Sequence, residues 1–345
     1  MSGYFSVLFV GGTGAISASC VAEAVGQGMT VTVLNRGRSS GSRPLPSAVE
    51  TLVADINDHP AVSAALEGRH FDAVVNFQCF TRADAERDIQ LFTGHTGHYV
   101  HISSASVYHR PLPKSPVTES TLAHNPDCDY MAGKVEAEAV FIKAFAEQNF
   151  PVTIVRPAHT YDHASPPLPG SWAVIDRIER GEPVVVPGDG TSLWTLTHAA
   201  DLAVGLVGLL GRPSTFGEAF HITSNDTFSW DQIYEAIGHA LGVKPRLCHL
   251  STEFIQLAAP DWFWSGLIDG DLAHTEIYNN SKIRNYVPQF NPVRSFEREV
   301  FHLLAWRREH PDQARADVAE DAVIARLVTA YSQARDVIAG LSRTN

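Results

Sequence analysis

The 345-residue chain has few cysteines, no long apolar run and no excess of positive charge. Its four cysteines are Cys20, Cys79, Cys128 and Cys248. They form no CxxC pair and no ligand spacing with histidine, which argues against a disulfide framework and against a zinc site. We therefore expect a reduced, cytoplasmic compartment and no bound metal.

Two further absences narrow the class of protein. No segment reaches the about 18 consecutive apolar residues of a membrane span, and the opening "MSGYFSVLFVGG" lacks the basic stretch of a signal peptide. The formal net charge is −12, from 26 basic and 38 acidic residues. A field of this sign does not hold nucleic acid or an anionic membrane, so both are unlikely partners and a small-molecule substrate is expected.

Strand-like and helix-like patterns alternate through the first part of the chain. Strands are expected at 5–10, 30–35, 50–55, 71–77, 98–104 and 151–157, and helices at 14–26, 59–68, 83–95 and 130–148. Such alternation is typical of a parallel sheet covered on both faces. The sequence therefore predicts an α/β fold with a Rossmann-type doubly wound parallel sheet.

Beyond Pro157 the pattern changes. A proline-rich connection at 163–171 precedes the strand and turn "GEPVVVPGDGTSLW", a helix at 198–210 and a strand at 218–224. From about Asn225 the chain is mainly helical. We expect a dinucleotide-binding domain made of 1–170 and 198–225, and a smaller, mainly helical C-terminal substrate domain made of 171–197 and 226–345.

A glycine-rich turn follows the first strand, in the segment "VLFVGGTGAIS". Its predicted cofactor contacts are Gly11, Gly12, Thr13, Gly14, Ala15 and Ile16. Side chains in place of the glycines would keep a pyrophosphate from the helix N-terminus, where free N–H groups and the positive end of the dipole bind it. The alternative is a tight turn that serves packing alone.

The second strand ends in "VLNRGRS". Folds that bind NAD usually place an acid here for the ribose 2′-hydroxyl, whereas this chain has Asn35 followed by Arg36 and Arg38. Guanidinium groups favour a 2′-phosphate, so the sequence predicts NADP(H) in preference to NAD(H). The alternative is that both arginines are ordinary surface residues.

Other strand ends complete the predicted cofactor set. Asp55 and Ile56 follow the third strand, where the adenine would lie, and Phe77 and Gln78 close the fourth strand. Pro157 follows the sixth strand. Each of these is also compatible with simple packing at a strand end.

Tyr130 and Lys134 occupy one face of their helix, because they are separated by one turn. An ammonium beside a phenol stabilises the phenolate and lowers its pKa from about 10, as a base for a substrate hydroxyl requires. Ser104, at the end of the fifth strand, is placed to hydrogen-bond the same substrate oxygen. Taken alone, the pair is also compatible with an ordinary amphipathic surface.

The segments "GGTGAIS", "ISSASVY", "YMAGK", "VRPAHTYD", "VPGDGTSLWTLTHAADLA" and "NNSKIRNYVPQF" together resemble the extended short-chain dehydrogenase/reductase family, the NAD-dependent epimerase/dehydratase group that includes UDP-galactose 4-epimerases. The resemblance runs from residue 11 to about 290. It implies that Tyr130 is the acid/base, that Lys134 is its electrostatic and ribose-binding partner and that Ser104 assists. It also implies a homodimer.

The chain departs from the family pattern at several places. Ser17 replaces the third glycine, and "SAS" at 104–106 replaces the Thr-Asp-Glu of sugar 4,6-dehydratases. Trp194 stands where related nucleotide-sugar epimerases carry an arginine for the diphosphate. An indole offers a stacking face in place of charge, so we expect a sugar or sugar-like substrate other than a typical UDP-sugar. The alternative is a core role for Trp194, with phosphate bound by other residues.

The predicted substrate contacts are Ser104, Ser106, His159 and Trp194. His159 and His163 follow the sixth strand, and a histidine there can titrate near neutral pH or be a plain polar loop residue. The predicted function is an NAD(P)-dependent oxidoreductase or epimerase acting on a secondary alcohol of this substrate. The alternatives are an ordinary nucleotide-sugar 4-epimerase and a non-catalytic NADP- or RNA-binding protein on the same fold.

Overall fold

The computed structural model of the protein describes residues 4–38 and 41–341. The chain separates into two compact units. Unit 1 comprises Met1–Asp162, Thr197–Asn225 and Tyr278–Arg294, and unit 2 comprises His163–Leu196, Asp226–Ile277 and Ser295–Asn345. The assignment of cofactor to one unit and substrate to the other stays a prediction.

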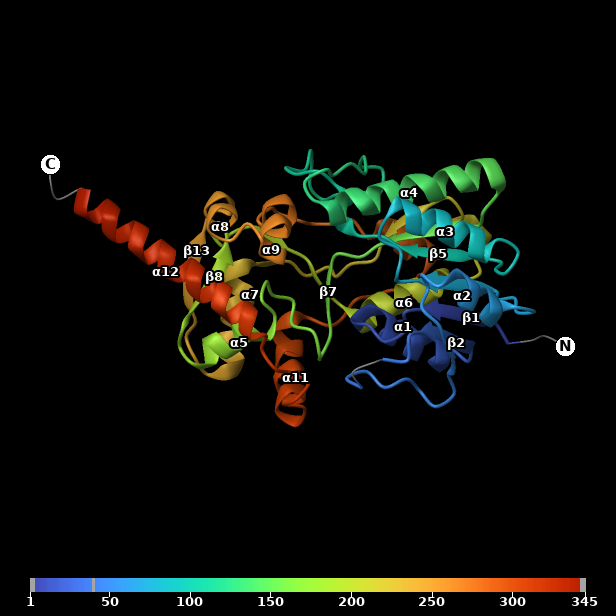
Figure 1. Ribbon diagram of the computed structural model, residues 1–345, viewed down its shortest axis with the longest axis horizontal. Helices are drawn as coiled ribbons and strands as arrows, with labels where there is room; N and C mark the ends of the chain where they lie inside the picture. Colours follow the sequence, from blue (N-terminus) through green and yellow to red (C-terminus); the bar gives the residue numbers. More distant parts are fainter. Residues whose placement is uncertain (1–3, 39–40, 342–345) are drawn as a thin grey trace. The chain divides into compact units, whose positions relative to one another are not determined.

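Unit 1 is built on a parallel sheet (Figure 1). Its strands within the described residues are β1 Ser6–Val10, β2 Thr30–Asn35, β3 Glu50–Val53, β4 Ala73–Asn76, β5 Tyr99–Ile102, β6 Val152–Arg156 and β11 Ala219–His221. The spatial order is β11-β6-β5-β4-β1-β2-β3, and each pair of neighbours is parallel. The predicted Rossmann-type doubly wound sheet is confirmed. From β1 the chain adds β2 and β3 on one side and β4, β5 and β6 on the other, so the order of the strands reverses between β1 and β4. Doubly wound folds bind their ligands at such a point.

Helices cover both faces of this sheet. They are α1 Ala15–Gly26, α2 His59–Leu66, α3 Arg82–Phe92, α4 Asp129–Gln148, α6 Ala199–Leu209 and α10 Ser281–Tyr286. Along β1, Val7 and Phe9 pack in the core with α1, α6 and α10, whereas Leu8 and Val10 pack in the core with α2, α3 and α4. This alternation follows from the two-residue period of a strand, and it explains why β1 is apolar throughout.

Local sequence determines where several helices begin. Thr81 caps α3 by accepting a hydrogen bond from the N–H of Asp84, while the Asp84 carboxylate accepts from the N–H of Thr81. Asp58 caps α2 through the N–H of Ala61. These side chains satisfy N–H groups that have no partner within the helix, and such caps are typically worth about 1 kcal/mol.

Residues 278–294 lie in unit 1, although the sequence analysis assigns them to the second domain. The reason is the apolar face of α10 and the segment after it. Ile283, Val287 and Phe290 are buried in the same core as α1 and α6. This return of the chain from unit 2 has no local signal, because a short amphipathic helix can pack on either unit.

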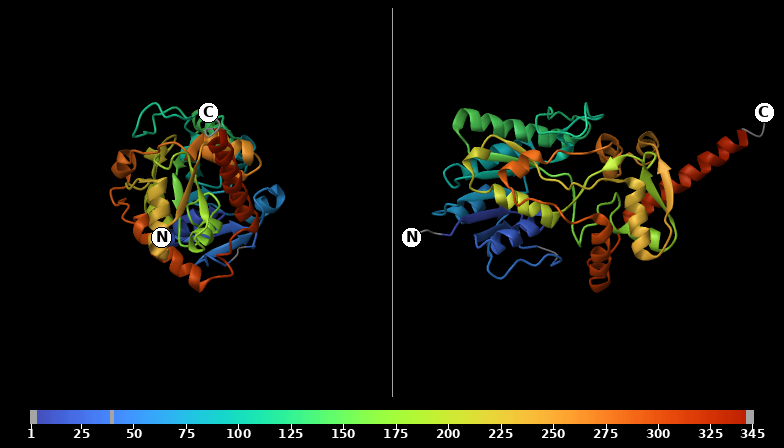
Figure 2. Two further views of the ribbon diagram at one scale, coloured as in Figure 1. Left: turned by 90° about the vertical axis from the view of Figure 1, so that its left-hand side faces the viewer. Right: turned by 180° about the vertical axis from the view of Figure 1, so that it is seen from behind.

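Unit 2 is smaller and mainly helical. Its helices are α5 Trp172–Glu179, α7 Trp230–Leu241, α8 Thr252–Ala258, α9 Phe263–Leu267, α11 Phe296–Glu309 and α12 Val318–Leu341. Its strands pair as β8 Pro183–Pro187 with β13 Arg246–Leu250 and as β9 Leu193–Trp194 with β12 Phe228–Ser229. The last turns of α12 extend beyond the rest of this unit, as Figure 2 shows. Two further short strands, β7 His159–Tyr161 and β10 Leu196–His198, pair with each other.

Among the described residues, no helix combines the length and the apolar character that crossing a bilayer requires.

Several histidines are fully buried in unit 1. His98 accepts a hydrogen bond at Nδ1 from the N–H of Gly211 at 3.1 Å, so its Nε2 carries the proton and donates to Thr153 Oγ1 at 2.8 Å. Burial lowers the pKa of His98 to about 4 and that of His221 to about 3. Both rings are therefore neutral in the folded chain at neutral pH.

Acidification should therefore destabilise the protein. A histidine whose folded pKa is depressed binds its proton in the unfolded chain first, so stability is lost as the pH falls from about 6.5 towards 4. Each such histidine contributes a slope of up to about 1.4 kcal/mol per pH unit. We expect His98→Gln to flatten the fall in free energy of unfolding, measured by urea denaturation at several pH values. The exposed His70→Gln is the control, and an equal slope in both variants would refute the assignment.

Candidate active site

A cavity of about 610 Å³ lies along the carboxyl edge of the sheet in unit 1. The predicted residues that line it are Gly11, Thr13, Gly14, Ala15, Ile16, Asn35, Arg36, Arg38, Asp55, Ile56, Phe77, Gln78, Ser104, Tyr130, Lys134 and Pro157. Parallel strands end at one edge, which brings these distant segments together. Four predicted residues, Gly12, Ser106, His159 and Trp194, are not part of this lining.

The glycine turn leaves no room for side chains. Gly11 has a φ of +84°, and a Cβ there would lie 2.9 Å from the side chain of Gln78. A Cβ on Gly12 would lie 2.7 Å from Val33, so Gly12 serves packing against the sheet. Gly14 is the N-cap of α1, and the backbone there is open to the cavity. These features fit the pyrophosphate of a dinucleotide.

Ser17 explains one departure from the family pattern. Its Oγ accepts a hydrogen bond from the N–H of Gly14 at 2.8 Å, as the third residue of a capping box does. Ser17 also lines the cavity. The hydroxyl therefore stabilises the first turn of α1 at a position where the family usually has glycine.

Two arginine side chains that follow β2 line the cavity. Asn35 Oδ1 accepts from the N–H of Gly37 at 2.8 Å, so this side chain holds the turn. Arg36 and Arg38 line the cavity and are exposed. A 2′-phosphate could therefore meet two guanidinium groups here.

An ion pair connects the loop after β2 to a residue far along the chain. Arg43 forms a bidentate pair with Asp162, with Nε and Nη2 at 2.5 and 2.7 Å from the carboxylate oxygens. The side chains of Arg43 and Asp162 are only 12% and 4% exposed. This pair joins the loop that carries Arg36 and Arg38 to the end of β7.

Lys134 is buried at the site and held by two backbone carbonyls. It is 2% exposed, and its Nζ donates to the carbonyl oxygens of Cys79 and Ile102, both at 2.7 Å. Nζ also lies 4.4 Å from the ring centroid of Phe80. An ammonium has three N–H donors, so among the described residues one donor is left for a ligand in the cavity. Burial lowers the pKa of Lys134 to about 8.

Tyr130 lies one turn earlier on α4 and is 37% exposed. The Nζ of Lys134 is 6.0 Å from its ring centroid, and the ring of Phe80 is 6.5 Å away. The phenol and the ammonium thus belong to one side of the helix, as their spacing predicts, and both line the cavity.

Ser104 lies two residues beyond the end of β5 and lines the same cavity. Its Oγ lies 2.7 Å from the Oγ of Ser106, and the N–H of Ala105 donates to the carbonyl of Pro157 at 2.8 Å. Ser106 is 4% exposed, so its hydroxyl is directed to Ser104 instead of lining the cavity. Ser106 thus orients the hydroxyl of Ser104.

His159 and Trp194 differ from the other predicted contacts. Burial lowers the pKa of His159 to about 4, so this ring is neutral at neutral pH. Trp194 is 1% exposed and lies in unit 2, where its ring stacks on Trp230 with centroids 5.7 Å apart. This packing agrees with the core role that the sequence analysis gives as the alternative. His163 also lies in unit 2 and packs on Trp306.

Sequence reasoning missed several residues of the lining, among them Ser17, Asn57, Phe80, Ser103 and Thr160. Phe80 follows β4 and Ser103 follows β5, so their places just beyond strand ends were an available signal. Nothing in the sequence shows that the ring of Phe80 covers Lys134, because the two residues are far apart along the chain.

The comparisons with known proteins agree with this geometry. A sequence model described as the NAD dependent epimerase/dehydratase family matches residues 7–222. The chain is 28% identical over 240 residues to 2′-dehydrokanamycin reductase of Streptomyces kanamyceticus, covering 68% of this chain and 66% of the relative. It is 24% identical over 259 residues to a chloroplast stem-loop binding protein of 41 kDa of Arabidopsis thaliana, covering 70% and 65%. The chain thus spans slightly less than two thirds of the length of these curated relatives.

The fold also has solved counterparts. UDP-glucuronic acid 4-epimerase from Bacillus cereus, in complex with UDP-glucuronic acid and NAD, superimposes with a TM-score of 0.70 at 17% identity. The match covers 88% of this chain and 99% of the epimerase. At this identity the likeness concerns the fold.

Gly133, between Tyr130 and Lys134, lets α4 approach the end of β4. A Cβ there would lie 2.6 Å from the carbonyl oxygen of Phe80, which is backbone and cannot rotate away. We expect Gly133→Ala to lower the free energy of unfolding by about 1–3 kcal/mol, measured by urea denaturation.

The control for this substitution is Gly340→Ala in α12, where a Cβ would meet nothing within 4 Å. There the higher helix propensity of alanine should leave stability unchanged or raise it by up to about 1 kcal/mol. Equal stability of the Gly133→Ala variant and the wild type would show that the close approach is not needed.

Proposed function

The chain belongs to the NAD dependent epimerase/dehydratase family, and from this we propose that it transfers hydride between a nicotinamide dinucleotide and a secondary alcohol carbon of a sugar or sugar-like substrate. One observation carries the proposal. Tyr130 and the buried Lys134 line the same cavity as the glycine turn at the start of α1. A packing role alone does not explain why an ammonium is buried beside the cavity that the glycine turn lines.

The chain's own groups have defined tasks in this reaction. A bound nicotinamide dinucleotide supplies or accepts the hydride. When a ketone is reduced, the Tyr130 hydroxyl gives its proton to the carbonyl oxygen, and in the oxidation the phenolate takes the alcohol proton. Lys134 stabilises the phenolate and offers its remaining N–H to a ribose hydroxyl. Ser104, oriented by Ser106, donates to the same substrate oxygen.

Reduction or oxidation of a sugar ring carbon is favoured over the alternatives. The similarity to a protein named 2′-dehydrokanamycin reductase supports a ketone on an amino sugar as the substrate. Sugar 4,6-dehydration is disfavoured, because Ala105 and Ser106 stand where that reaction uses an acidic pair. An ordinary nucleotide-sugar 4-epimerase is the second candidate. It would show strong thermal stabilisation by UDP-sugars and none by free sugars or glycosides.

A test of the chemistry is Tyr130→Phe. Loss of the phenol should lower kcat by roughly 10² or more while the dissociation constant for cofactor changes little. Turnover is followed by the absorbance of the reduced nicotinamide, with oxidised glycosides and UDP-sugars as two substrate panels. Tyr4→Phe, at a residue 80% exposed and outside the cavity, is the control. Near-normal turnover of Tyr130→Phe would end the proposed role.

We propose NADP(H) as the preferred cofactor. The support is that no carboxylate side chain ends β2 and that Arg36 and Arg38 line the cavity there. A 2′-phosphate between two arginines gains charge-assisted hydrogen bonds that a 2′-hydroxyl does not. NAD stays the alternative, since the solved epimerase counterpart is in complex with NAD.

The double variant Arg36→Ser/Arg38→Ser tests this preference. Its dissociation constant for NADP should rise by about 10- to 100-fold, as expected when one or two charged hydrogen bonds are lost. The constant for NAD should change by less than about threefold, since only the phosphate contact is removed. Arg326→Ser, an exposed arginine of α12, is the control for the loss of charge. Tighter binding of NAD than of NADP by the wild type would overturn the preference.

A non-catalytic role is the rival from another class. The similarity to a chloroplast stem-loop binding protein is the observation that favours RNA. The net charge of −12 argues against it, because RNA affinity depends on neutralising phosphates. An RNA gel shift that survives physiological salt, together with no turnover of any alcohol or ketone, would select this candidate. A cofactor-sensing protein without chemistry would bind NADP and be indifferent to Tyr130→Phe.

We also propose a homodimer in the cytoplasm. The dimer is implied by the family, whose members commonly pair through two helices of the nucleotide domain, and light scattering of the purified chain measures it. The four cysteines are free, which is compatible with a reducing compartment.

A further inference from the structure

A buried ion pair lies beneath the helix that carries Tyr130 and Lys134. Glu138 of α4 and Arg156 of β6 are 4% and 6% exposed. Arg156 Nε and Nη2 donate to the two carboxylate oxygens of Glu138 at 2.9 and 2.5 Å. This bidentate geometry satisfies both groups away from water, which a buried pair requires.

Glu138 has a third partner. The Oγ of Ser103, which is also 4% exposed, donates to Glu138 Oε1 at 2.5 Å. Ser103 directly precedes Ser104 at the end of β5. Glu138 is therefore the point at which α4 is tied both to β6 and to the backbone that carries the candidate substrate-binding hydroxyl.

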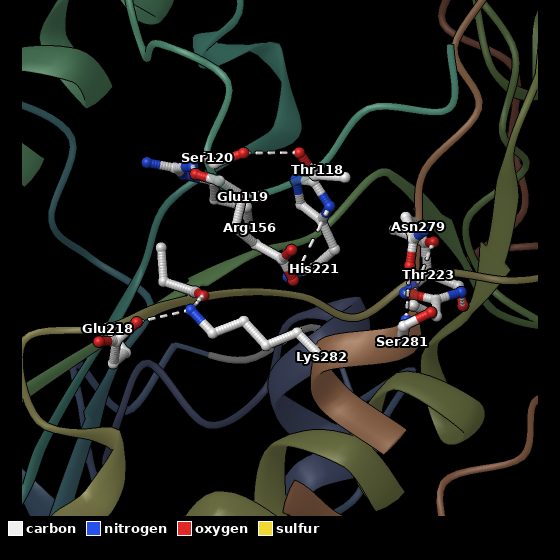
Figure 3. Close-up of polar contacts among 12 residues, drawn as sticks. Thr118, Glu119, Ser120, Arg156, Glu218, His221, Thr223, Asn279, Ser281 and Lys282 are labelled. Carbon is white, nitrogen blue, oxygen red and sulfur yellow. Dashed lines mark hydrogen bonds and ion pairs between the residues drawn. The ribbon is translucent and has the colours of Figure 1, made fainter. Parts of the chain in front are cut away.

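Arg156 is held from its other side as well. Its Nη1 donates to Tyr108 Oη at 2.7 Å, and that hydroxyl lies 2.7 Å from His221 Nε2. Figure 3 shows Arg156 beside Glu119 and His221, where the backbone N–H of His221 donates to the Glu119 carboxylate at 3.0 Å. Arg156 is therefore bound on two sides, to Glu138 and to Tyr108.

Lys134 lies one turn before Glu138 on the same helix. Burial lowers the pKa of Lys134, while negative charge on Cys79, Glu138 and Asp84 opposes this. Burial also raises the pKa of the Cys79 thiol far above its usual range, so Cys79 carries no charge at neutral pH. Glu138 and Asp84 are then the negative charges that oppose the effect of burial on the pKa of Lys134.

A buried histidine, His101, lies near Lys134 and Arg156. His101 of β5 is fully buried, and neither ring nitrogen has a hydrogen-bond partner among the described residues. Burial, Lys134 and Arg156 lower its pKa well below the usual range. His101 is thus neutral and adds no positive charge beside Lys134 and Arg156.

From this geometry we infer that Glu138 is a positioning residue of the candidate active site. It binds Ser103 and Arg156 at once, which holds the adjoining Ser104 in place, and it lies one helical turn after Lys134, where its charge favours the ammonium. The inference rests on the proposed function for its catalytic consequence. A purely structural ion pair would stabilise the fold without affecting the charge of Lys134 or the placement of Ser104.

The test compares three variants. Glu138→Gln removes the charge, Ser103→Ala removes one anchor and leaves the ion pair intact, and Glu136→Gln is the matched control. Glu136 lies on the same helix, and its side chain is 55% exposed. We expect kcat to fall at least about tenfold in Glu138→Gln and about three- to tenfold in Ser103→Ala, with KM and cofactor affinity nearly unchanged. Glu136→Gln should match the wild type.

The charge of Lys134 is measured separately from turnover. Its titration is followed by the ¹³Cε NMR signal, assigned with Lys134→Met. The spectrum is simple because the chain has five lysines, namely Lys114, Lys134, Lys143, Lys244 and Lys282. We expect the midpoint to fall by about one pH unit in Glu138→Gln and to stay unchanged in Ser103→Ala and Glu136→Gln.

Each outcome bears on the inference. An unchanged Lys134 midpoint in Glu138→Gln, or an unchanged kcat in Ser103→Ala, would overturn it. If Glu138→Gln does not fold, Glu138→Asp replaces it, because the shorter carboxylate keeps the charge but cannot reach both partners. That variant should lose kcat without moving the midpoint. A wild type without turnover would refute the proposed function instead, and the Lys134 midpoint would still decide whether the charge of Glu138 acts on the ammonium.

Discussion

The buried ammonium of Lys134 connects a helix and two strand ends at the candidate active site of this protein. Lys134 donates to the carbonyl of Cys79 at the end of β4 and to that of Ile102 at the end of β5. These two carbonyls lie at the edge of the sheet, and they hold the helix that also carries Tyr130. An ammonium without such partners would be strongly destabilising at 2% exposure. The lysine is therefore a structural link between α4 and the ends of two strands, in addition to the chemical role proposed for it.

Close approach of the backbone makes this link possible. Gly133 brings α4 against Phe80, and Gly11 and Gly12 bring the first turn against Gln78 and Val33. The absence of Cβ atoms at these places lets the helix and the turn approach the sheet more closely than side chains permit. Behind them, Glu138 and Arg156 form a buried polar layer that sets how α4 meets β5 and β6.

The fold was predictable because its signals are local. Apolar strands alternating with amphipathic helices indicate a parallel sheet, and the chain has the predicted order of elements through β6. The glycine turn, Asn35, Arg36, Arg38 and the Tyr130/Lys134 pair line one cavity because parallel strands all end at the same edge. Their separate roles as cofactor and catalytic contacts stay predictions. Residues 278–294 were placed in the wrong domain, because nothing local distinguishes which core a short helix will join.

By itself, the sequence determined the alternation of strands and helices, the glycine turn and the shared helical face of Tyr130 and Lys134, since each depends on neighbours within a few residues. Only the tertiary structure decided that Trp194 packs on Trp230, that Ser106 orients Ser104 and that Phe80 covers Lys134. Only the tertiary structure, too, brings Ser103 and Arg156 into hydrogen bonds with the Glu138 carboxylate. Apart from the pair Ser104 and Ser106, these contacts link residues from different elements. Burial, which no local pattern specifies, determines whether a polar side chain lines a cavity or supports one.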